Sequence, residues 1–329
     1  MSLIDDVWAQ TIDGFSFGFI NALQIRLKAG RLTRADFMRY VEAWENKTLE
    51  EYYALPTGLA LPELPDSGCV RLPTPHPSGC VENDHLHLDL WLGPKGWASP
   101  CMFLLHGVMS VSDVGYRLWA KALNKQGWTA AFFHLPYHYG RRPRGAMSGE
   151  MALTSNLVRT AEGIRQAVIE LRWIIAGLKA KGTPHIGLWG TSYGGWISGL
   201  LIVLENQIST AWLLEPIADV DLAVWQSPAT ITLRRQLRKE GITREDTSRL
   251  LHLVCPGMNQ PLLDPKNILL VGGIFDKIAP VDSLRALNQK WAGSRYAEFR
   301  QGHVGYQLMP QSLRLAKEAY PGLFTPGAS

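Results

Sequence analysis

The chain has 329 residues, of which 46% are hydrophobic and 19% charged, a composition typical of a globular protein with a sizeable core. The length allows one large α/β domain or two smaller domains. The net charge of +4, without any dense basic run, argues against nucleic-acid binding.

Cysteine usage excludes a disulfide scaffold, because the chain has only four cysteines, widely spaced and without a C-x-x-C pair. Cys69 and Cys80 flank a proline-rich loop and could pair with each other, although free thiols are the simpler interpretation. A structural zinc site is not expected.

The first ten residues, MSLIDDVWAQ, lack the basic and apolar regions of a signal peptide. No apolar run reaches the roughly 18 residues needed to span a bilayer. We therefore expect a soluble cytoplasmic protein without stable membrane insertion. The apolar segment Gly14–Leu23 is compatible with contact to a membrane or a partner, but composition favours a helix packed on its own domain.

The N-terminal region is predicted to be helical over its first 55 residues, with a second helix that starts at Thr33 and runs through Leu55. The following segment, Pro56–Ser78, contains six prolines and is predicted to be a loop. Residues 1–80 are thus interpreted as a helical extension with a proline-rich linker, and residues 81–329 as the main domain.

The main domain alternates short apolar runs with helical patterns. The expected strands are HLHLDLWL (85–92), CMFLL (101–105), TAAFFHL (129–135), HIGLWG (185–190), TAWLLE (210–215), NILLVGG (267–273) and SRYAEF (294–299). Helical patterns over 116–127 and 151–182 separate some of them. The alternation predicts βαβ units and a mostly parallel sheet with helices on both faces. Residues 219–261 interrupt it with two or three expected helices, interpreted as a lid over the sheet edge.

The sequence LWGTSYGGW (188–196) contains the pattern G-x-S-x-G, with Ser192 at its centre. It lies between an expected strand and an expected helix, which is the sharp turn that places a serine nucleophile. Side chains at Gly190 or Gly194 would collide in such a turn. The Tyr193 amide, at the helix N-terminus, is predicted to stabilise an oxyanion.

A serine nucleophile needs a base and a carboxylate that orients it. His303 follows the last expected strand, and Asp276 follows the strand before it. Both are therefore expected at the same sheet edge as Ser192, in the chain order Ser, Asp, His.

These motifs resemble those of the α/β-hydrolases. GTSYGG is similar to the family's nucleophile elbow, GGIFDKIAP to its acid loop, QGHVG to its histidine loop and HGVM to its oxyanion loop. The resemblance covers about residues 86–319. It implies that His106 and Gly107 shape a turn after a strand and that Val108 or Met109 donates the second oxyanion N–H.

The resemblance does not decide which carboxylate orients the histidine, because some relatives place this residue after the preceding strand, where Glu215 and Asp219 lie. Asp282 fits better as the first-turn charge of a helix. HGVM departs from the HGGG of one lipase and esterase branch. Residues 134–150 are similar to a poorly characterised branch that also carries a helical N-terminal extension.

Substrate contacts are predicted for His106, Arg141, Arg142 and Trp225. The two arginines, with Arg144, lie in a loop expected near the active-site edge and could meet an acidic group; a solvated basic loop is the alternative. The motif H-x-H-x-D at His85, His87 and Asp89 suggests a metal, but on a strand these side chains would simply face solvent. Neither a metal nor another cofactor is expected.

Together these features predict a serine hydrolase that cleaves a small carboxylic ester through an acyl-enzyme. The same three residues would also suit thioesters, lactones, amides or acyl transfer. A non-catalytic binding protein on a hydrolase scaffold is the remaining alternative.

Overall fold

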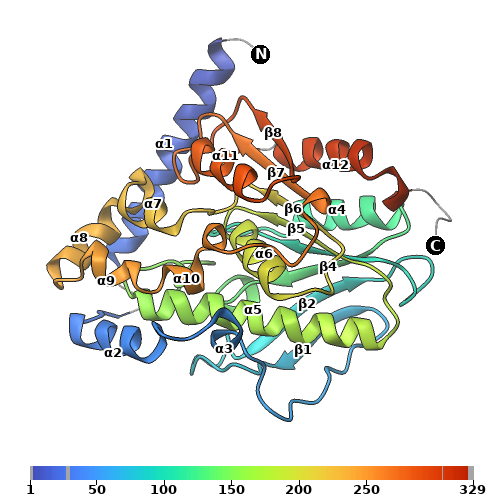
Figure 1. Ribbon diagram of the computed structural model, residues 1–329, viewed down its shortest axis with the longest axis horizontal. Helices are drawn as coiled ribbons and strands as arrows, with labels where there is room; N and C mark the ends of the chain where they lie inside the picture. Colours follow the sequence, from blue (N-terminus) through green and yellow to red (C-terminus); the bar gives the residue numbers. More distant parts are fainter. Residues whose placement is uncertain (1–2, 27–29, 306, 325–329) are drawn as a thin grey trace.

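An eight-stranded sheet forms the centre of the molecule, in a computed structural model that describes residues 3–26, 30–305 and 307–324 (Figure 1). The strands are β1 (Gly68–Pro73), β2 (His85–Trp91), β3 (Cys101–Leu105), β4 (Thr129–His134), β5 (Ile186–Thr191), β6 (Thr210–Leu214), β7 (Ile268–Gly273) and β8 (Arg295–Phe299). Their order is β1-β2-β4-β3-β5-β6-β7-β8. β2 is antiparallel to both its neighbours, and the other pairs are parallel.

Helices cover both faces of the sheet, which explains why its central strands are continuous apolar runs. Successive residues of a strand point to opposite faces. Phe103 and Leu105 therefore join the core beneath α5 (Leu157–Ala180), α6 (Tyr193–Leu204) and α11 (Val281–Lys290). Met102 and Leu104 join the core beneath α4 (Val114–Asn124) and α12 (Leu308–Ala319). The predicted α/β architecture with a mostly parallel sheet is confirmed.

The segment between β6 and β7 holds more helices than the two or three expected, and all of them are short. They are α7 (Val220–Trp225), η2 (Pro228–Thr230), α8 (Ile231–Lys239), α9 (Arg244–Ser248), α10 (Leu251–Val254), η3 (Pro256–Met258) and η4 (Pro265–Asn267). We call residues 219–261 the insert. The remaining short helices are η1 (Tyr139–Arg141), after β4, and η5 (Pro321–Leu323), after α12.

Helix α1 (Leu3–Ile25) packs against the insert. Asn21 donates a hydrogen bond to the Pro228 carbonyl and accepts one from the Thr232 amide, both at 2.8 Å. Within the apolar segment of α1, Phe17 and Leu23 are buried, whereas Phe15 and Phe19 are exposed. Among the described helices, none combines the length and apolar character needed to cross a bilayer.

The second N-terminal helix is shorter than predicted. α2 (Arg34–Trp44) begins after its N-cap Thr33, as expected, but ends eleven residues before Leu55, and a separate α3 (Leu49–Tyr52) follows. The break occurs because Thr48 caps α3: its hydroxyl accepts the Glu51 amide, and the Glu51 carboxylate accepts the Thr48 amide at 2.8 Å.

The proline-rich segment is not entirely a loop, because it contains β1. This strand pairs only with β2, at the edge of the sheet, where a missing backbone N–H is tolerated. Pro73 is its last residue.

The polar face of β2 was expected to face solvent, and this prediction was wrong for two of its residues. The side chains of His87 and Asp89 are only 12% and 17% exposed. The ring of His134, from β4, stacks on His87 with centroids 4.0 Å apart, and its Nε2 lies 3.2 Å from Asp89 Oδ2. The side chain of His134 therefore contacts both residues.

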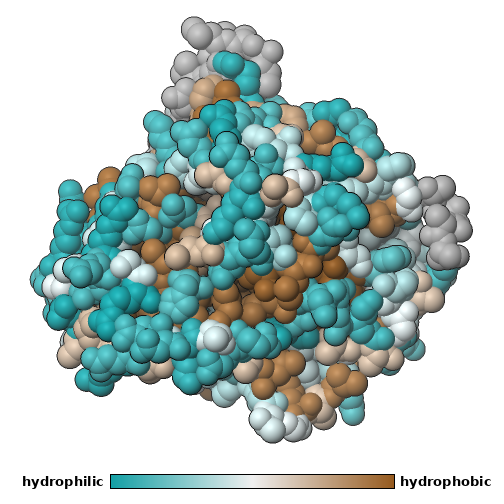
Figure 2. All heavy atoms as spheres, in the orientation of Figure 1, coloured by the Kyte–Doolittle hydropathy of each residue, from teal (hydrophilic) through white to brown (hydrophobic). Residues whose placement is uncertain are grey.

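Apolar residues also gather on the surface, near the middle of the face seen in Figure 1 and above α5, within mainly hydrophilic surroundings (Figure 2). The exposed large apolar side chains of the described residues include Met258 and Leu262, which follow α10. Met258 also lines a hollow of about 670 Å³, together with Leu251 and Leu287. That hollow contains none of the three residues predicted to carry catalysis.

Candidate active site

Ser192 occupies a tight turn between β5 and α6. Its backbone angles, φ 54° and ψ −113°, are rarely adopted by a non-glycine residue. The Ser192 amide donates to the Leu214 carbonyl at 2.7 Å, which ties the turn to β6. A Cβ on Gly190 would lie 2.4 Å from the Gly194 oxygen, and one on Gly194 would lie 2.2 Å from the Leu105 oxygen. Both glycines are therefore required by close backbone approach.

The structure brings together the three residues for which catalysis was predicted. Ser192 Oγ lies 2.7 Å from His303 Nε2, and His303 Nδ1 lies 2.7 Å from Asp276 Oδ2. The other carboxylate oxygen of Asp276 accepts the backbone N–H groups of Ile278 and Ala279, at 2.7 and 2.9 Å. The carboxylate is thus held from two sides and fixes the imidazole with Nε2 toward the serine.

The electrostatic environment of His303 favours its protonated form. Burial works to lower the pKa of the imidazole, but the charge and hydrogen bond of Asp276 and the charge of Asp13 outweigh it, so the pKa is raised above its ordinary value. An imidazole in this setting accepts a proton from Ser192 more readily than one in water.

Asp13, on α1, is part of this site, and the sequence analysis missed it. Its carboxylate accepts the His303 amide at 2.8 Å and the Val304 amide at 2.9 Å. The residue is only 2% exposed, and burial raises the pKa of its carboxyl although the two amides lower it. The available signal was an acidic residue directly before the apolar run that begins at Gly14.

The two alternative acids do not replace Asp276. Glu215 is buried beside Asp276 and His303, but its burial and the charges of Asp276 and Asp13 hold the pKa of its carboxyl well above the ordinary range. The carboxyl group of Glu215 therefore ionises less readily than that of a free glutamate. Asp219 instead caps α7 by accepting the Leu222 amide at 2.9 Å. Asp282 lies in the first turn of α11, as expected.

A cavity of about 600 Å³ opens at Ser192 and His303. Helix α1 supplies Phe15, Ser16, Phe19 and Ile20 to its wall, and the insert supplies Val220, Ala223 and Val224. The predicted oxyanion residues Val108, Met109 and Tyr193 also line it. No Asp, Glu, Lys or Arg lines this pocket in the described part of the chain. The pocket is therefore apolar around one histidine and a few hydroxyl groups.

Arg141 and Arg142 do not contact this pocket, contrary to the prediction. Arg141 is 1% exposed, and its guanidinium makes two hydrogen bonds of 2.7 Å to the buried Glu170 carboxylate. It therefore anchors the loop after β4 within the core. Arg142 is exposed and donates to the Tyr139 carbonyl at 3.0 Å. Arg144 is almost fully exposed, which agrees with the alternative of a solvated basic loop for these two residues.

His106 and Trp225 also lie outside the pocket wall. Both ring nitrogens of the buried His106 are occupied: Nδ1 lies 2.9 Å from the Gly107 carbonyl, and Nε2 accepts the Leu135 amide at 3.1 Å. This residue joins two loops and does not reach substrate. Trp225 lines a smaller hollow of about 80 Å³, which shares Trp196 and Val220 with the pocket.

Comparisons with known proteins identify the fold. No protein-family model matches the chain. It is similar to an uncharacterized protein of Mycobacterium tuberculosis, 24% identical over 201 residues, which are 58% of this chain and 45% of that protein. The chain thus matches about half the length of this curated relative.

Three solved structures resemble the chain. Acetyl xylan esterase 1 from Thermoanaerobacterium sp. JW/SL YS485 has a TM-score of 0.60 and 17% identity, covering 90% of this chain and 96% of its own. Thermogutta terrifontis esterase 2, phosphoramylated by tabun, has a TM-score of 0.53 and 18% identity, and the match covers 80% of this chain and 98% of the esterase chain. A puromycin-hydrolyzing peptidase of M. tuberculosis has a TM-score of 0.53 and 17% identity, and the match covers 80% of this chain and 40% of the peptidase chain. The chain has the α/β-hydrolase fold.

Proposed function

We propose that the chain is a serine hydrolase that cleaves small carboxylic esters with an apolar acyl group. The observation that carries this proposal is the pair of 2.7 Å contacts that link Ser192 to His303 and His303 to Asp276 at an apolar pocket. A serine hydroxyl gains nucleophilicity only when such a base takes its proton.

In the acylation step, Ser192 Oγ attacks the carbonyl carbon of the ester while its proton passes to His303 Nε2. Asp276 accepts the hydrogen bond from Nδ1 and stabilises the imidazolium that forms. The Tyr193 amide and that of Val108 or Met109 are the proposed donors to the oxyanion, a contribution of about 3–4 kcal/mol per donor in comparable enzymes. His303 then protonates the leaving alcohol.

In the deacylation step, His303 removes a proton from water, which attacks the acyl carbon. The tetrahedral intermediate uses the same two amides, and the proton returns to Ser192 Oγ as the acid leaves. Each step needs only groups of this chain and the substrate.

The walls of the pocket support an uncharged, apolar acyl group. A charged substrate would lose hydration there without an opposite charge to replace it, since no Asp, Glu, Lys or Arg lines the pocket among the described residues. Phe15 and Phe19 are 78% and 47% exposed, which places them on the solvent side of the wall.

The same three residues would cleave a thioester, a lactone or an amide, or pass the acyl group to another acceptor. Structural neighbours include peptidases as well as esterases, and at these identities they support the fold and leave the bond type to experiment.

Hydrolysis of 4-nitrophenyl esters from acetyl to dodecanoyl, beside the matching 4-nitroanilides and thioesters, tests the proposal. We expect esters to be cleaved, with a preference for acyl groups longer than acetyl, and activity to be lost in Ser192→Ala and His303→Ala. Ser16→Ala is a matched control, because Ser16 lines the same pocket but donates to the Ile12 carbonyl at 3.0 Å. Equal rates of ester hydrolysis in wild type and Ser192→Ala would contradict the proposal. Cleavage of the anilides without cleavage of the esters would show that the substrate is an amide.

A further inference from the structure

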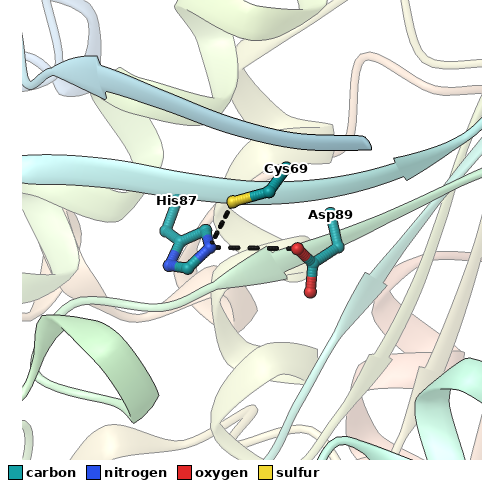
Figure 3. A group of neighbouring side chains, drawn as sticks. All are labelled: Cys69, His87 and Asp89. Carbon is teal, nitrogen blue, oxygen red and sulfur yellow. Dashed lines mark hydrogen bonds and ion pairs between the residues drawn. The ribbon is translucent and has the colours of Figure 1, made fainter. Parts of the chain in front are cut away.

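Three side chains with metal-binding atoms converge on the edge strand β1 and its neighbour β2 (Figure 3), and none of them lines the pocket. Cys69 Sγ lies 2.8 Å from His87 Nε2, and the same nitrogen lies 3.8 Å from Asp89 Oδ1. The sulfur, nitrogen and oxygen atoms all lie within 4.8 Å of one another. This cluster has no role in the proposed hydrolysis.

The strand register creates the convergence. Cys69 on β1 is directly opposite Asp89 on β2, and His87 stands two residues before Asp89, so all three side chains point to one face of the sheet. On the other side of β2, His134 is opposite His87, and its Nε2 lies 3.2 Å from Asp89 Oδ2. Backbone pairing therefore holds the cluster, rather than a chance choice of rotamers.

The geometry does not fit a cysteine nucleophile with a histidine–aspartate relay. In such a relay the thiol and the carboxylate engage different ring nitrogens. Here one nitrogen, Nε2 of His87, faces both groups (Figure 3), and a Cβ added to Gly140 would lie 3.3 Å from the other ring nitrogen, Nδ1. Donor atoms that all point at one place are instead the arrangement that a bound cation requires.

We propose that Cys69, His87 and Asp89 bind a zinc ion. A thiolate, an imidazole nitrogen and a carboxylate oxygen are the three ligand types that zinc takes in proteins. Because Cys69 is exposed, a water molecule can complete the tetrahedron. Binding releases the thiol proton to solvent, and the two negative ligands balance the charge of the ion.

A neighbouring side chain suits this role. His134 can donate its Nε2 proton to the second oxygen of Asp89, the kind of outer hydrogen bond that orients a carboxylate ligand. The ion would cross-link β1, the edge strand, to β2.

The experiment is a titration of the metal-free full chain with Co²⁺, followed by displacement with Zn²⁺. A cobalt ion bound to a thiolate gives a near-ultraviolet charge-transfer band, which the other cluster of possible ligands, Glu215, Asp276 and His303, cannot produce because it lacks sulfur. We expect one ion per chain, and a Zn²⁺-dependent rise in melting temperature.

Cys69→Ser should abolish the band, and Asp89→Asn should weaken Zn²⁺ binding by more than about 10-fold, the loss seen when even an outer partner of a zinc ligand is removed. Matched controls are Cys80→Ser, a second partly accessible thiol that lies outside the cluster, and His85→Gln, two residues before His87 on β2. Both should bind as wild type. Circular dichroism verifies that each variant is folded. If Cys69→Ser does not fold, Asp89→Asn still tests the proposal.

Absence of the band in folded wild type at excess Co²⁺ would overturn the proposal. So would a band that survives Cys69→Ser, or one that is lost in Cys80→Ser, because the sulfur ligand would then be a different one.

Discussion

At the scale of single residues, Asp13 connects α1 to the catalytic chemistry that we propose. Its carboxylate accepts the amides of His303 and Val304, and a Cβ on Gly302 would lie 2.3 Å from Asp13 Oδ2. The carboxylate therefore lies directly on the histidine loop. Asp13 is a positioning residue, since it contacts the backbone of the loop rather than the reacting atoms.

Asp13→Asn tests this role through the pH profile of kcat/KM. The negative charge of Asp13 helps to raise the pKa of His303, so its removal should lower that pKa and move the acid limb of the profile to lower pH. Each carboxylate oxygen of Asp13 accepts one amide, and asparagine replaces one of these oxygens by an NH₂ group that cannot accept. The lost hydrogen bond should cost about 1–3 kcal/mol of unfolding free energy. Ser16→Ala, one turn along α1, should leave the acid limb unchanged.

An unmoved acid limb in folded Asp13→Asn, with only the stability reduced, would mean that Asp13 holds the helix in place without influencing His303. If Ser16→Ala also moved the acid limb of the pH profile, the movement would result from a disturbance of α1 and not from the charge of Asp13.

Glu215 gives a second prediction, because it is buried beside the site and burial raises the pKa of its carboxyl. Its pKa is raised in the folded chain, whereas in the unfolded chain it should be about 4.3. Above that pH the unfolded state releases the proton and the folded state keeps it, so the carboxyl group makes the protein less stable as the pH rises. Glu215→Gln removes this dependence. We expect its melting temperature to exceed that of wild type by an amount that grows from pH 4 toward pH 7.

Thermal unfolding of both proteins across that range measures the difference, with Glu63→Gln, an exposed position, as the control. A difference that stays constant with pH would show that Glu215 is ionised in the folded protein.

The candidate residues themselves were predictable from sequence to differing extents. Ser192, Asp276 and His303 lie in short motifs that follow apolar strands, so strand order alone brings them to one sheet edge. Arg141 was misplaced because its partner Glu170 lies 29 residues away on α5, and no local pattern reveals a buried ion pair. Asp13 was missed for the same reason, since its partners are 290 residues distant.

At the scale of elements, the turn at Ser192 depends on the absence of side chains around it. We predict that Gly194→Ala lowers the unfolding free energy by about 1–3 kcal/mol and removes esterase activity, because its Cβ would press on the Leu105 carbonyl. That oxygen belongs to β3 and cannot move without its sheet. Denaturant unfolding and ester hydrolysis, measured together, check both effects.

Gly115→Ala, at an exposed position of helix α4, is the control, since a Cβ there meets nothing within 4 Å. It should instead raise stability by about 0.5–1 kcal/mol. A Gly194→Ala variant with wild-type activity would show that the turn can relax and that its strain is not needed.

Elements with strong local patterns were predicted well, and those defined by pairing were not. The central strands agree to within about a residue or two, because buried apolar runs between turn signals leave little choice. β1 was missed because prolines surround it and only its partner β2 reveals it. The break between α2 and α3 depends on a capping box at Thr48, which an uninterrupted helical pattern conceals.

At the scale of the whole molecule, three regions distant in sequence build the pocket. Helix α1, the insert and the loops at the ends of β3, β5 and β8 all contribute side chains. The sequence indicated the fold and its catalytic edge through repeated βαβ patterns, but the placement of α1 across the pocket follows from contacts with the insert that have no local signal. The sheet could therefore be predicted from the sequence, whereas the residues that form the wall of the pocket could not.

The most direct test of the central claim is fluorophosphonate labelling of the purified protein, with mass spectrometry to locate the adduct. Such probes react with a serine whose base and oxyanion donors are assembled. We predict one adduct, on Ser192, that disappears in His303→Ala and persists in Ser16→Ala. Folded protein without any adduct, or with the adduct on a different serine, would contradict the assignment of Ser192 as the nucleophile.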